Sequence, residues 1–311
     1  MHYLVTGGAG FIGSHLTELL LDRGHQVTII DNLSTGKKEN VPDNATLIIA
    51  DVCDADAIAQ YMEKVDGCFH LAAIASVQAS VTDWIGTHRT NLGGTISVLN
   101  AARARGAHSP TPVVLASSAA VYGNSTDLPL NEKSATSPTS AYGLDKLASE
   151  MHGKLAWEMY QVPVSALRFF NVYGPRQDPS SPYSGVMSIF FERIRNELPF
   201  TVFGDGLQSR DFIYVKDLVH YLYQEMQGLN EGFVVTNICT GRETNLLNLI
   251  QALSSALGKS AIYSHESARP GDIKRSLGDP NRLNGRHPNM RPTDLQDGII
   301  EMTNAILAVD V

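Results

Sequence analysis

The chain begins with the stretch Met1-His2-Tyr3-Leu4-Val5-Thr6-Gly7-Gly8-Ala9-Gly10-Phe11-Ile12-Gly13. Its first residues are mostly apolar and predict a short strand, which breaks into a glycine-rich turn. The glycines allow a tight turn, a close backbone approach to a pyrophosphate and close packing of the following helix. We expect that helix to run from Ser14 to Arg23, with its free N–H groups facing the phosphates. The stretch therefore predicts a dinucleotide site at the start of the chain.

A second strand, Gln26–Ile30, ends in Asp31. An acid at this strand end suits the two hydroxyls of an adenosine ribose and repels a 2′-phosphate. This favours NAD over NADP, although the nearby Lys37 and Lys38 leave room for NADP. Glycine-rich turns and a capping aspartate also occur in ordinary loops, so both features count mainly because they occur together.

Apolar runs alternate with helical stretches through the first half of the chain. The runs are 4–6, 27–30, 47–50, 67–71, 113–117 and 164–169. This pattern predicts an α/β fold with a Rossmann-type, doubly wound parallel sheet, whose ligands bind at the carboxyl ends of the strands. At these ends, Asp51-Val52 could hold the adenine ring, and Leu71-Ala72-Ala73 leaves space for the cofactor backbone.

Two domains are expected. The first is an NAD-binding domain over 1–169, to which 207–241 returns. The second is a smaller, mostly C-terminal substrate-binding domain formed by 170–206 and 242–311. Each would be of modest size for a chain of 311 residues.

Composition limits the partners. With 24 basic and 32 acidic residues, a formal charge of -8 provides no basic field for nucleic acid. No apolar stretch is long enough to span a membrane, and the first residues already belong to a strand, so no signal peptide is expected. The cysteines, Cys53, Cys68 and Cys239, are odd in number and lack metal-ligand spacing, which indicates free thiols and no metal site. We expect a cytoplasmic protein.

The strongest catalytic candidates follow the fifth apolar run. Ser117 and Ser118 end that run, and Tyr142 and Lys146 come later, four residues apart. On a helix the pair shares one face, so the ammonium would lower the pKa of the phenol from its usual value of about 10. Ser118 could orient the same substrate oxygen. Tyrosine and lysine at this spacing are ordinary on a helix, but less so after a dinucleotide fingerprint.

The whole chain resembles extended short-chain dehydrogenase/reductases of the nucleotide-sugar epimerase family, through TGGAGFIG, the serine-rich strand end and YxxxK. The resemblance implies that Tyr142 is the catalytic base, that Lys146 lowers its pKa and holds the nicotinamide ribose, and that Ser118 assists at the sugar hydroxyl. Asn91 matches a family asparagine near the active site, and a packing or capping role for it is equally open. A homodimer through the helix of Tyr142 and the helix before it is also implied.

The same resemblance extends the set of expected contacts. The predicted cofactor contacts are Gly7, Gly10, Phe11, Ile12, Gly13, Asp31, Asn32, Ser34, Thr35, Gly36, Asp51, Val52, Leu71, Ala72, Ala73, Asn91, Ser117, Tyr142 and Lys146. The predicted substrate contacts are Ser76, Ser118, Tyr142, Asn171, Val186, Thr201, Phe203, Arg210, Arg269, Asp272 and Ser276.

The resemblance also implies a specific role for several of the predicted substrate contacts. Asn171 is similar to a residue that contacts the sugar diphosphate, and Phe203 lies in the uracil and diphosphate region. Arg210 and Arg269 would clamp the diphosphate, because a guanidinium bonds phosphate at two points. Asp272 would bind the uridine ribose. A surface Arg-Asp ion pair is the competing interpretation for each arginine.

The type of reaction is indicated by acidic residues that this chain lacks. Relatives that eliminate water or decarboxylate carry acids where this chain has Ala119 and Ala120, so dehydration lacks its general acid. Reversible oxidation at C4 remains: Tyr142 takes the 4-hydroxyl proton, NAD accepts the hydride, and the ketose turns before hydride returns. NAD should then stay bound, although Ala75 replaces a lysine that lies near the cofactor in some epimerases.

The resemblance to the epimerases also implies that Ser276 selects the sugar, because a bulky aromatic at this position would crowd an N-acetyl group. A small side chain here, together with Ser76, predicts UDP-GlcNAc and UDP-GalNAc as substrates, with UDP-Glc and UDP-Gal also open. The alternatives are a UDP-glucuronate 4-epimerase, another NAD-dependent nucleotide-sugar oxidoreductase, and a non-catalytic NAD-binding protein.

Overall fold

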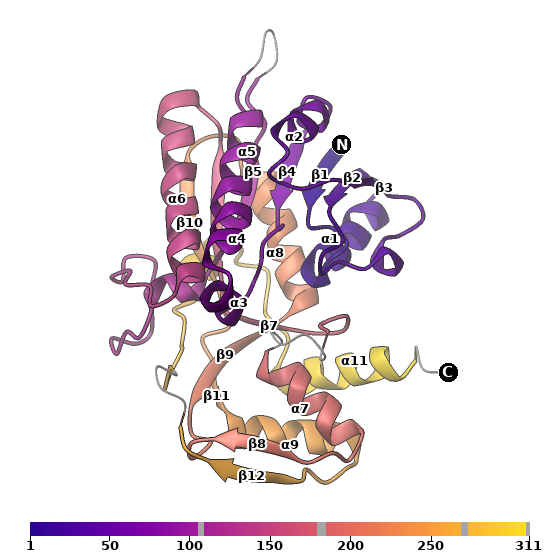
Figure 1. Cartoon of the computed structure of the whole chain (residues 1–311), viewed down its shortest axis with the longest axis vertical. Helices are drawn as coiled ribbons and strands as arrows, with labels where there is room; N and C mark the ends of the chain where they lie inside the picture. The colour runs from indigo at the N-terminus through magenta and orange to yellow at the C-terminus, as the bar shows by residue number, and fades with distance from the viewer. Residues whose placement is uncertain (105–108, 179–184, 269–272, 309–311) are drawn as a thin grey trace. The chain divides into compact units, whose positions relative to one another are not determined.

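The computed structural model describes residues 1–104, 109–178, 185–268 and 273–308. The chain divides into two compact units (Figure 1). The first comprises Met1–Gly123, Thr136–Phe169 and Val219–Thr236, and the second comprises Asn124–Ala135, Phe170–Leu218 and Asn237–Val311. The segment that returns to the first unit is thus shorter than the predicted 207–241, and 124–135 belongs to the second unit.

The first unit contains the predicted Rossmann-type sheet. It has seven strands in the order β10-β6-β5-β4-β1-β2-β3. Their bounds are β1 His2–Thr6, β2 Gln26–Asp31, β3 Thr46–Ile49, β4 Gly67–His70, β5 Val113–Ser118, β6 Val164–Phe169 and β10 Phe233–Ile238. The pairs from β3 through β6 are parallel. The six predicted strands are confirmed to within about one residue at most ends, and β10 adds a seventh from the returning segment.

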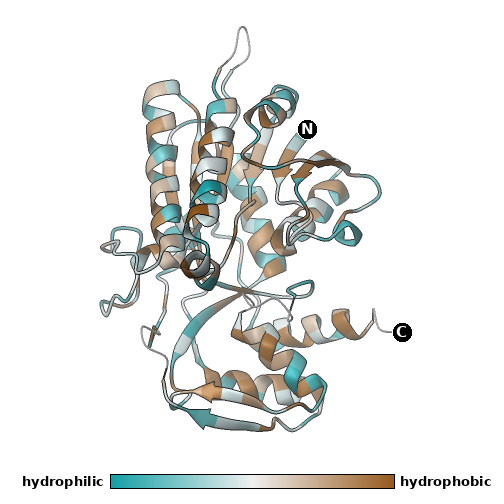
Figure 2. Cartoon of the chain, in the orientation of Figure 1, coloured by the Kyte–Doolittle hydropathy of each residue, from teal (hydrophilic) through white to brown (hydrophobic). Residues whose placement is uncertain are grey.

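Helices pack on both faces of this sheet because the strands are apolar on both sides. Leu4 packs into one core with Ile58 and Val98, whereas the neighbouring Tyr3 points to the other face, where Gln227 donates to its hydroxyl at 2.8 Å. Figure 2 shows hydrophobic colour along the strands and a mixture on the helices. The helices and turns are α1 Phe11–Asp22, η1 Lys38–Asn40, α2 Ala55–Met62, α3 Val77–Thr82, α4 Trp84–His88, η2 Arg89–Gly93, α5 Gly94–Ala101, η3 Ala119–Tyr122, α6 Ala141–Tyr160 and α8 Val215–Gly228.

The second unit is built on two small sheets. One has the strand order β11-β9-β7 and the other pairs β12 with β8. Its elements are β7 Asn171–Tyr173, α7 Val186–Arg195, β8 Phe200–Phe203, β9 Ser209–Tyr214, β11 Glu243–Asn245, α9 Leu246–Leu257, β12 Tyr263–Glu266, α10 Asn281–Arg286 and α11 Leu295–Leu307.

Strand β9 explains why 207–218 does not join the first unit as predicted. The strand pairs with β7 and β11, and its fully buried Asp211 accepts hydrogen bonds from the backbone N–H groups of Thr240 and Gly241 at 2.8 and 2.9 Å. A buried carboxylate needs such donors. This side chain therefore anchors the strand in the second unit.

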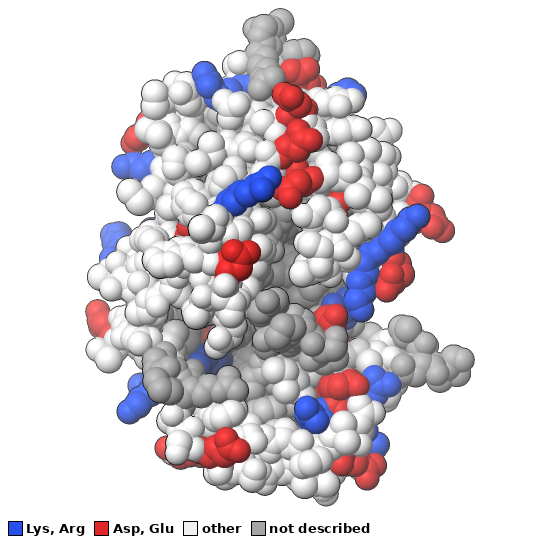
Figure 3. Space-filling model, viewed as in Figure 1, with Lys and Arg blue, Asp and Glu red and all other residues white. Residues whose placement is uncertain are grey.

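On the face seen in Figure 3, several acidic side chains form a row over the upper part, and lysines and arginines lie mostly nearer the edges. Within the described ranges, every helix is too short or too polar to serve as a membrane span. The same ranges contain no cluster of histidine, cysteine and acidic side chains that could hold a metal ion.

Gly7, in the loop between β1 and α1, and Gly13, in the first turn of α1, have no room for a side chain. Gly7 has φ +73°, and a Cβ on it would lie 2.7 Å from the backbone nitrogen of Ala72. A Cβ on Gly13 would lie 2.1 Å from the carbonyl oxygen of Gly7. Helix α1 begins at Phe11, three residues before the predicted start, because Gly10 is already its N-cap.

A pair of glycine variants separates close packing from backbone strain. Gly24 has φ +76°, and a Cβ on it would have no neighbour within 4 Å. Gly24→Ala should therefore lower the free energy of unfolding only by the left-handed backbone penalty of about 1–2 kcal/mol. Gly7→Ala should cost clearly more, since the new methyl group also collides with the backbone after β4. Urea unfolding of both variants measures this difference, and equal costs would contradict the close-packing argument.

Candidate active site

The glycine loop and the end of β4 lie side by side at the point where the sheet reverses its strand order. From β1 the chain proceeds to β2 and β3 on one side, and then crosses to β4 on the other. The loops are joined by a hydrogen bond from the backbone N–H of Ala72 to Thr6 Oγ1 at 3.3 Å. Such a switch point is where doubly wound sheets bind ligands. Three of the predicted cofactor contacts, Gly7, Leu71 and Ala72, are therefore brought together.

Asp31 is the last residue of β2 and is buried. Its carboxylate accepts hydrogen bonds from the backbone N–H groups of Ala9 at 3.0 Å and Leu33 at 2.8 Å. A Cβ on Gly36 would lie 2.8 Å from the same carboxylate. The acid thus ties the glycine loop to the segment after β2 that contains the predicted residues Ser34, Thr35 and Gly36.

The next strand end carries Asp51, which accepts a hydrogen bond from the backbone N–H of Cys53 at 2.8 Å. This hydrogen bond is the main reason that the pKa of Asp51 lies below its ordinary value. Asn32 Nδ2 approaches Asp51 Oδ2 at 3.5 Å, and Val52 is buried in the core. The ends of β2 and β3 are therefore connected by polar contacts.

Asn91 lies in the π-helical turn η2 and is buried. Its side-chain amide donates to the Ile74 carbonyl at 3.2 Å and accepts from the Ile74 N–H at 2.8 Å. The residue therefore has the packing role that the sequence left open, and its contact with a cofactor stays a prediction.

These features fit a dinucleotide. The loop has no room for a Cβ at Gly7 or Gly13, and no side chain caps the N-terminus of α1, where Phe11 and Ile12 begin the helix. Uncapped N–H groups at a helix N-terminus are well suited to a pyrophosphate. The residues that would hold the nucleotide are thus the glycine loop, the start of α1 and Asp31.

The three predicted catalytic side chains are brought together by strand β5 and helix α6. Ser118 is the last residue of β5, and Tyr142 and Lys146 lie on the first turns of α6. Ser118 hydrogen-bonds the phenol of Tyr142. The Lys146 Nζ donates to the Ala116 carbonyl at 2.8 Å and lies 5.9 Å from the centre of the Tyr142 ring.

The predicted lowering of the Tyr142 pKa is wrong. Burial raises this pKa above its ordinary value, and the hydrogen bond from Ser118 offsets only part of the increase. Lys146 does not reverse the effect, because its ammonium points to the Ala116 carbonyl and its own pKa is lowered to about 8 by burial. Burial disfavours the charged form of both groups.

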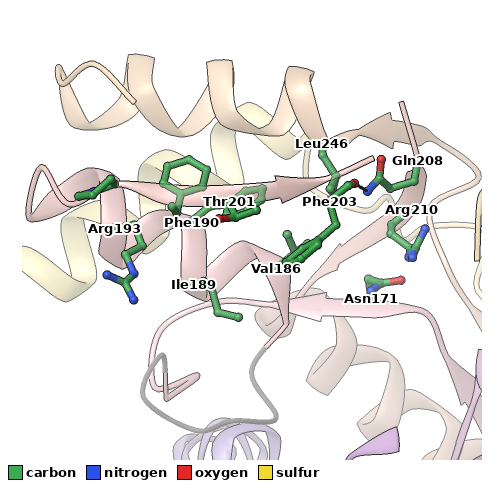
Figure 4. Close-up of a pocket in the computed structure, with 12 residues that line it drawn as sticks. Asn171, Val186, Ile189, Phe190, Arg193, Thr201, Phe203, Gln208, Arg210 and Leu246 are labelled. Carbon is green, nitrogen blue, oxygen red and sulfur yellow. Dashed lines mark hydrogen bonds between the residues drawn. The ribbon is translucent and has the colours of Figure 1, made fainter. Parts of the chain in front are cut away.

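Several predicted substrate contacts come together in the second unit. Asn171, Val186, Thr201, Phe203 and Arg210 all line one cavity of about 510 Å³. Figure 4 shows Val186 and Phe203 close together, with Asn171 and Arg210 at one end of the cavity and Arg193 towards the other. The arrangement offers apolar walls with a few polar groups, as small-molecule pockets do.

Other predicted substrate residues have different surroundings. Arg210 donates through Nη1 to the carbonyls of Ser209 at 2.8 Å and Ile273 at 2.7 Å. Ser276 is buried, and its N–H donates to the Ser209 carbonyl at 3.1 Å. Ser76 is the N-cap of α3, where its hydroxyl accepts from the N–H of Ala79. Arg269 and Asp272 lie outside the described residues.

The sequence did not predict part of the cavity, nor the buried polar contacts beneath Ser118, Tyr142 and Lys146. The additional cavity residues are Ile189, Phe190, Arg193, Pro199, Phe200, Gln208 and Leu246. The additional support is the buried ion pair of Glu150 and Arg168, with Ser117 as a further donor to the glutamate. The spacing of Glu150, one turn after Lys146, was the available signal.

The sheet, the glycine loop and the Ser-Tyr-Lys group define a nucleotide-dependent enzyme of the short-chain dehydrogenase/reductase type. Comparison with known proteins agrees. The family model described as "NAD dependent epimerase/dehydratase family" matches residues 3–239. The chain therefore belongs to this family. It is an enzyme of the NAD-dependent UDP-sugar 4-epimerases, and its cofactor is NAD.

Full-length relatives are known. A putative UDP-glucose 4-epimerase of Methanocaldococcus jannaschii is 36% identical over 306 residues, which cover 97% of each chain. A UDP-N-acetylglucosamine 4-epimerase from Methanobrevibacter ruminantium, solved in complex with UDP-N-acetylmuramic acid, has 35% identity and a TM-score of 0.92, covering 99% of this chain and 98% of its own. A UDP-glucose 4-epimerase from Thermotoga maritima, solved with UDP-glucose, has 31% identity, a TM-score of 0.93 and full coverage of both chains.

The lowered pKa of Lys146 predicts a pH-dependent stability. Between about pH 8 and pH 10 the unfolded chain binds more protons at this residue than the folded protein, so the residue's contribution to stability rises with pH. Relative to Lys146→Met, the wild type should gain about 1–2 kcal/mol of unfolding free energy from pH 8 to pH 9.5. Urea unfolding across this range measures the gain.

Lys154 supplies the matched control, because it lies on the same helix and is exposed. Lys154→Met should show the pH dependence of the wild type. If Lys146→Met and Lys154→Met behave alike, the buried ammonium of Lys146 has no lowered pKa.

Proposed function

We propose that the protein interconverts the C4 epimers of UDP-N-acetylhexoses, UDP-GlcNAc and UDP-GalNAc, through a 4-keto intermediate, and that it also accepts UDP-Glc and UDP-Gal. The observation that carries the proposal is the hydrogen-bonded group of Ser118 and Tyr142 with Lys146 beside it. No acidic residue stands at Ala119 or Ala120 to support dehydration.

Each catalytic side chain has a distinct role in this proposal. Tyr142 accepts the proton of the 4-hydroxyl and later returns it. Ser118 donates its single hydroxyl hydrogen to the Tyr142 oxygen before substrate binds and to the sugar oxygen once it is bound. Lys146 is held in place by the Ala116 carbonyl and carries positive charge below about pH 8. NAD, when bound, supplies the acceptor and donor of hydride.

We assign the cavity of the second unit to the UDP portion of the substrate. Phe203 and Val186 provide apolar walls for a base, while Arg210 and Asn171 lie at the end that would take phosphates (Figure 4). Anchoring through the nucleotide leaves the sugar free to turn between the two hydride transfers. Arg269 and Asp272 are proposed as further contacts to the diphosphate and the ribose.

The direct test is proton NMR of the purified protein with UDP-GlcNAc or UDP-Glc and no added nucleotide. We expect the anomeric signal of the 4-epimer to appear with both, because a redox-neutral cycle consumes no NAD. An enzyme that acts only on a uronate, or a protein that only binds NAD, would leave both substrates unchanged.

The sugar preference depends on the residue at position 276. Ser276→Tyr should abolish turnover of UDP-GlcNAc and retain that of UDP-Glc, because an aromatic ring would occupy the space of the N-acetyl group. The exposed Ser255 on α9 supplies the control, and Ser255→Tyr should leave both activities intact. Full activity of Ser276→Tyr on UDP-GlcNAc would contradict this assignment.

A homodimer is also proposed, through helix α6 and the continuous helical segment before it, which comprises α4, η2 and α5. Their surfaces expose large apolar side chains, among them Trp84 at 64%, Ile85 at 84% and Met151 at 66%. Exposed apolar patches of this kind mark protein interfaces. A second copy of the chain, presenting the same helices, would cover them.

Sedimentation velocity tests the dimer. Ile85→Asp should shift the protein to a monomer, because a charge in a closed apolar interface is costly. Ile262→Asp, at an isoleucine that is also exposed but lies in the second unit, should sediment like the wild type. A monomeric wild type would refute the proposal.

A further inference from the structure

A buried ion pair lies beneath the catalytic residues. The Glu150 carboxylate accepts two hydrogen bonds from Arg168, from Nε at 2.8 Å and from Nη2 at 2.7 Å. Ser117 Oγ donates to the same carboxylate, and Arg168 Nη1 donates to the Tyr122 hydroxyl at 2.9 Å. The side chains of Glu150 and Arg168 are each only 5% exposed.

Stability alone is a weak reason for such a pair. Removing two charges from water is expensive, and well-packed apolar side chains of similar volume often serve as well or better. The hydrogen bonds are directional, however, and a bidentate pair fixes the relative orientation of the two groups. The pair is therefore suited to holding elements in register.

The elements it holds are those that carry the catalytic groups. Tyr142, Lys146 and Glu150 recur every four residues and so share one face of α6. That face meets the last three residues of β5, since Tyr142 bonds Ser118, Lys146 bonds the Ala116 carbonyl and Glu150 bonds Ser117. Each contact lies one helical turn from the next.

Arg168 extends this contact beyond α6. It lies near the end of β6, beside β5 in the sheet, with Ser117 and Arg168 as direct partners in the strand register. Through Tyr122 it also reaches η3, which directly follows Ser118. Glu150 is therefore connected to the segments on both sides of Ser118.

We propose that Glu150 and Arg168 are positioning residues for proton transfer, which fix the rotation of α6 against β5 so that Tyr142 stays in hydrogen-bond contact with Ser118. Because each side chain is only 5% exposed, they act through Ser117, Tyr122 and the helix face they orient. The activity part of this inference rests on the proposed epimerase function.

The first test replaces both charges together. The double variant Glu150→Leu/Arg168→Met retains apolar volume and leaves no unpaired charge, so it should fold. We expect kcat for the epimerisation to fall about 10- to 100-fold, because small misplacements of reacting groups cost this much. KM should stay near that of the wild type. Wild-type kcat in the folded double variant would overturn the proposal.

A matched pair of serine variants keeps the ion pair intact. Ser117 and Ser165 are both buried strand serines whose hydroxyls donate to a buried glutamate, Glu150 on α6 and Glu225 on α8 respectively. Ser117→Ala should lower kcat, whereas Ser165→Ala should not. An equal effect of the two substitutions on kcat would overturn the proposal. This comparison tests the proposal even if the double variant fails to fold.

A substrate-independent measurement separates this inference from the proposed function. Tyr142 is replaced by 3,5-difluorotyrosine, which ionises at lower pH than tyrosine, and its titration is followed by ¹⁹F NMR. In the Ser117→Ala background the midpoint should shift upward, because loosening the Ser118 contact removes stabilisation of the phenolate. An unchanged midpoint would overturn the positioning role. If the wild type epimerises no UDP-sugar, the proposed function fails while this titration still tests the inference.

Discussion

The contact between the first half of α6 and the end of β5 positions the proposed catalytic groups of this protein. An ammonium and a carboxylate are both buried in that contact, and specific strand groups satisfy each of them. The Ala116 carbonyl accepts from Lys146, and the Arg168 guanidinium and the Ser117 hydroxyl donate to Glu150. Buried charges without such partners would be very costly. The same partners place the Tyr142 phenol against Ser118. Stability and catalytic geometry thus depend on one interface.

Burial shifts the pKa values of the two proposed catalytic groups in opposite directions. It raises the pKa of Tyr142 and lowers that of Lys146 to about 8, so the site favours a neutral phenol and reduces the charge of the nearby ammonium. In the proposed reaction, proton removal by Tyr142 therefore depends on specific hydrogen bonds such as the one with Ser118, which lowers the pKa of the phenol. A general attraction between neighbouring charges does not account for it.

Much of the first unit could be predicted from the sequence, because glycine-rich turns and apolar runs are local signals. Gly7 and Gly13 predicted the close backbone packing that the structure shows. The ionisation of Tyr142 could not be predicted, since it depends on burial and on the direction in which the Lys146 side chain points. The role of Asn91 could not be predicted either, because only the structure shows its side-chain amide paired with the backbone of Ile74.

The second unit was predicted less well because its signals are non-local. The position of β9 depends on hydrogen bonds from Thr240 and Gly241 to Asp211, and no local pattern in 207–218 reveals this. Resemblance to a known family nevertheless identified five residues that line one cavity, among them Phe203 and Arg210. The remaining cavity residues, such as Phe190 and Leu246, are apolar positions that look like ordinary core in the sequence.

In the proposed reaction, one hydrogen leaves carbon 4 of the sugar and returns to the same carbon. The most direct measurement uses UDP-GlcNAc that carries deuterium at carbon 4, incubated with the protein in ordinary water. We predict that the 4-epimer forms with its deuterium fully retained at carbon 4. An epimer that has lost the deuterium to solvent, or no epimer at all, would contradict this claim.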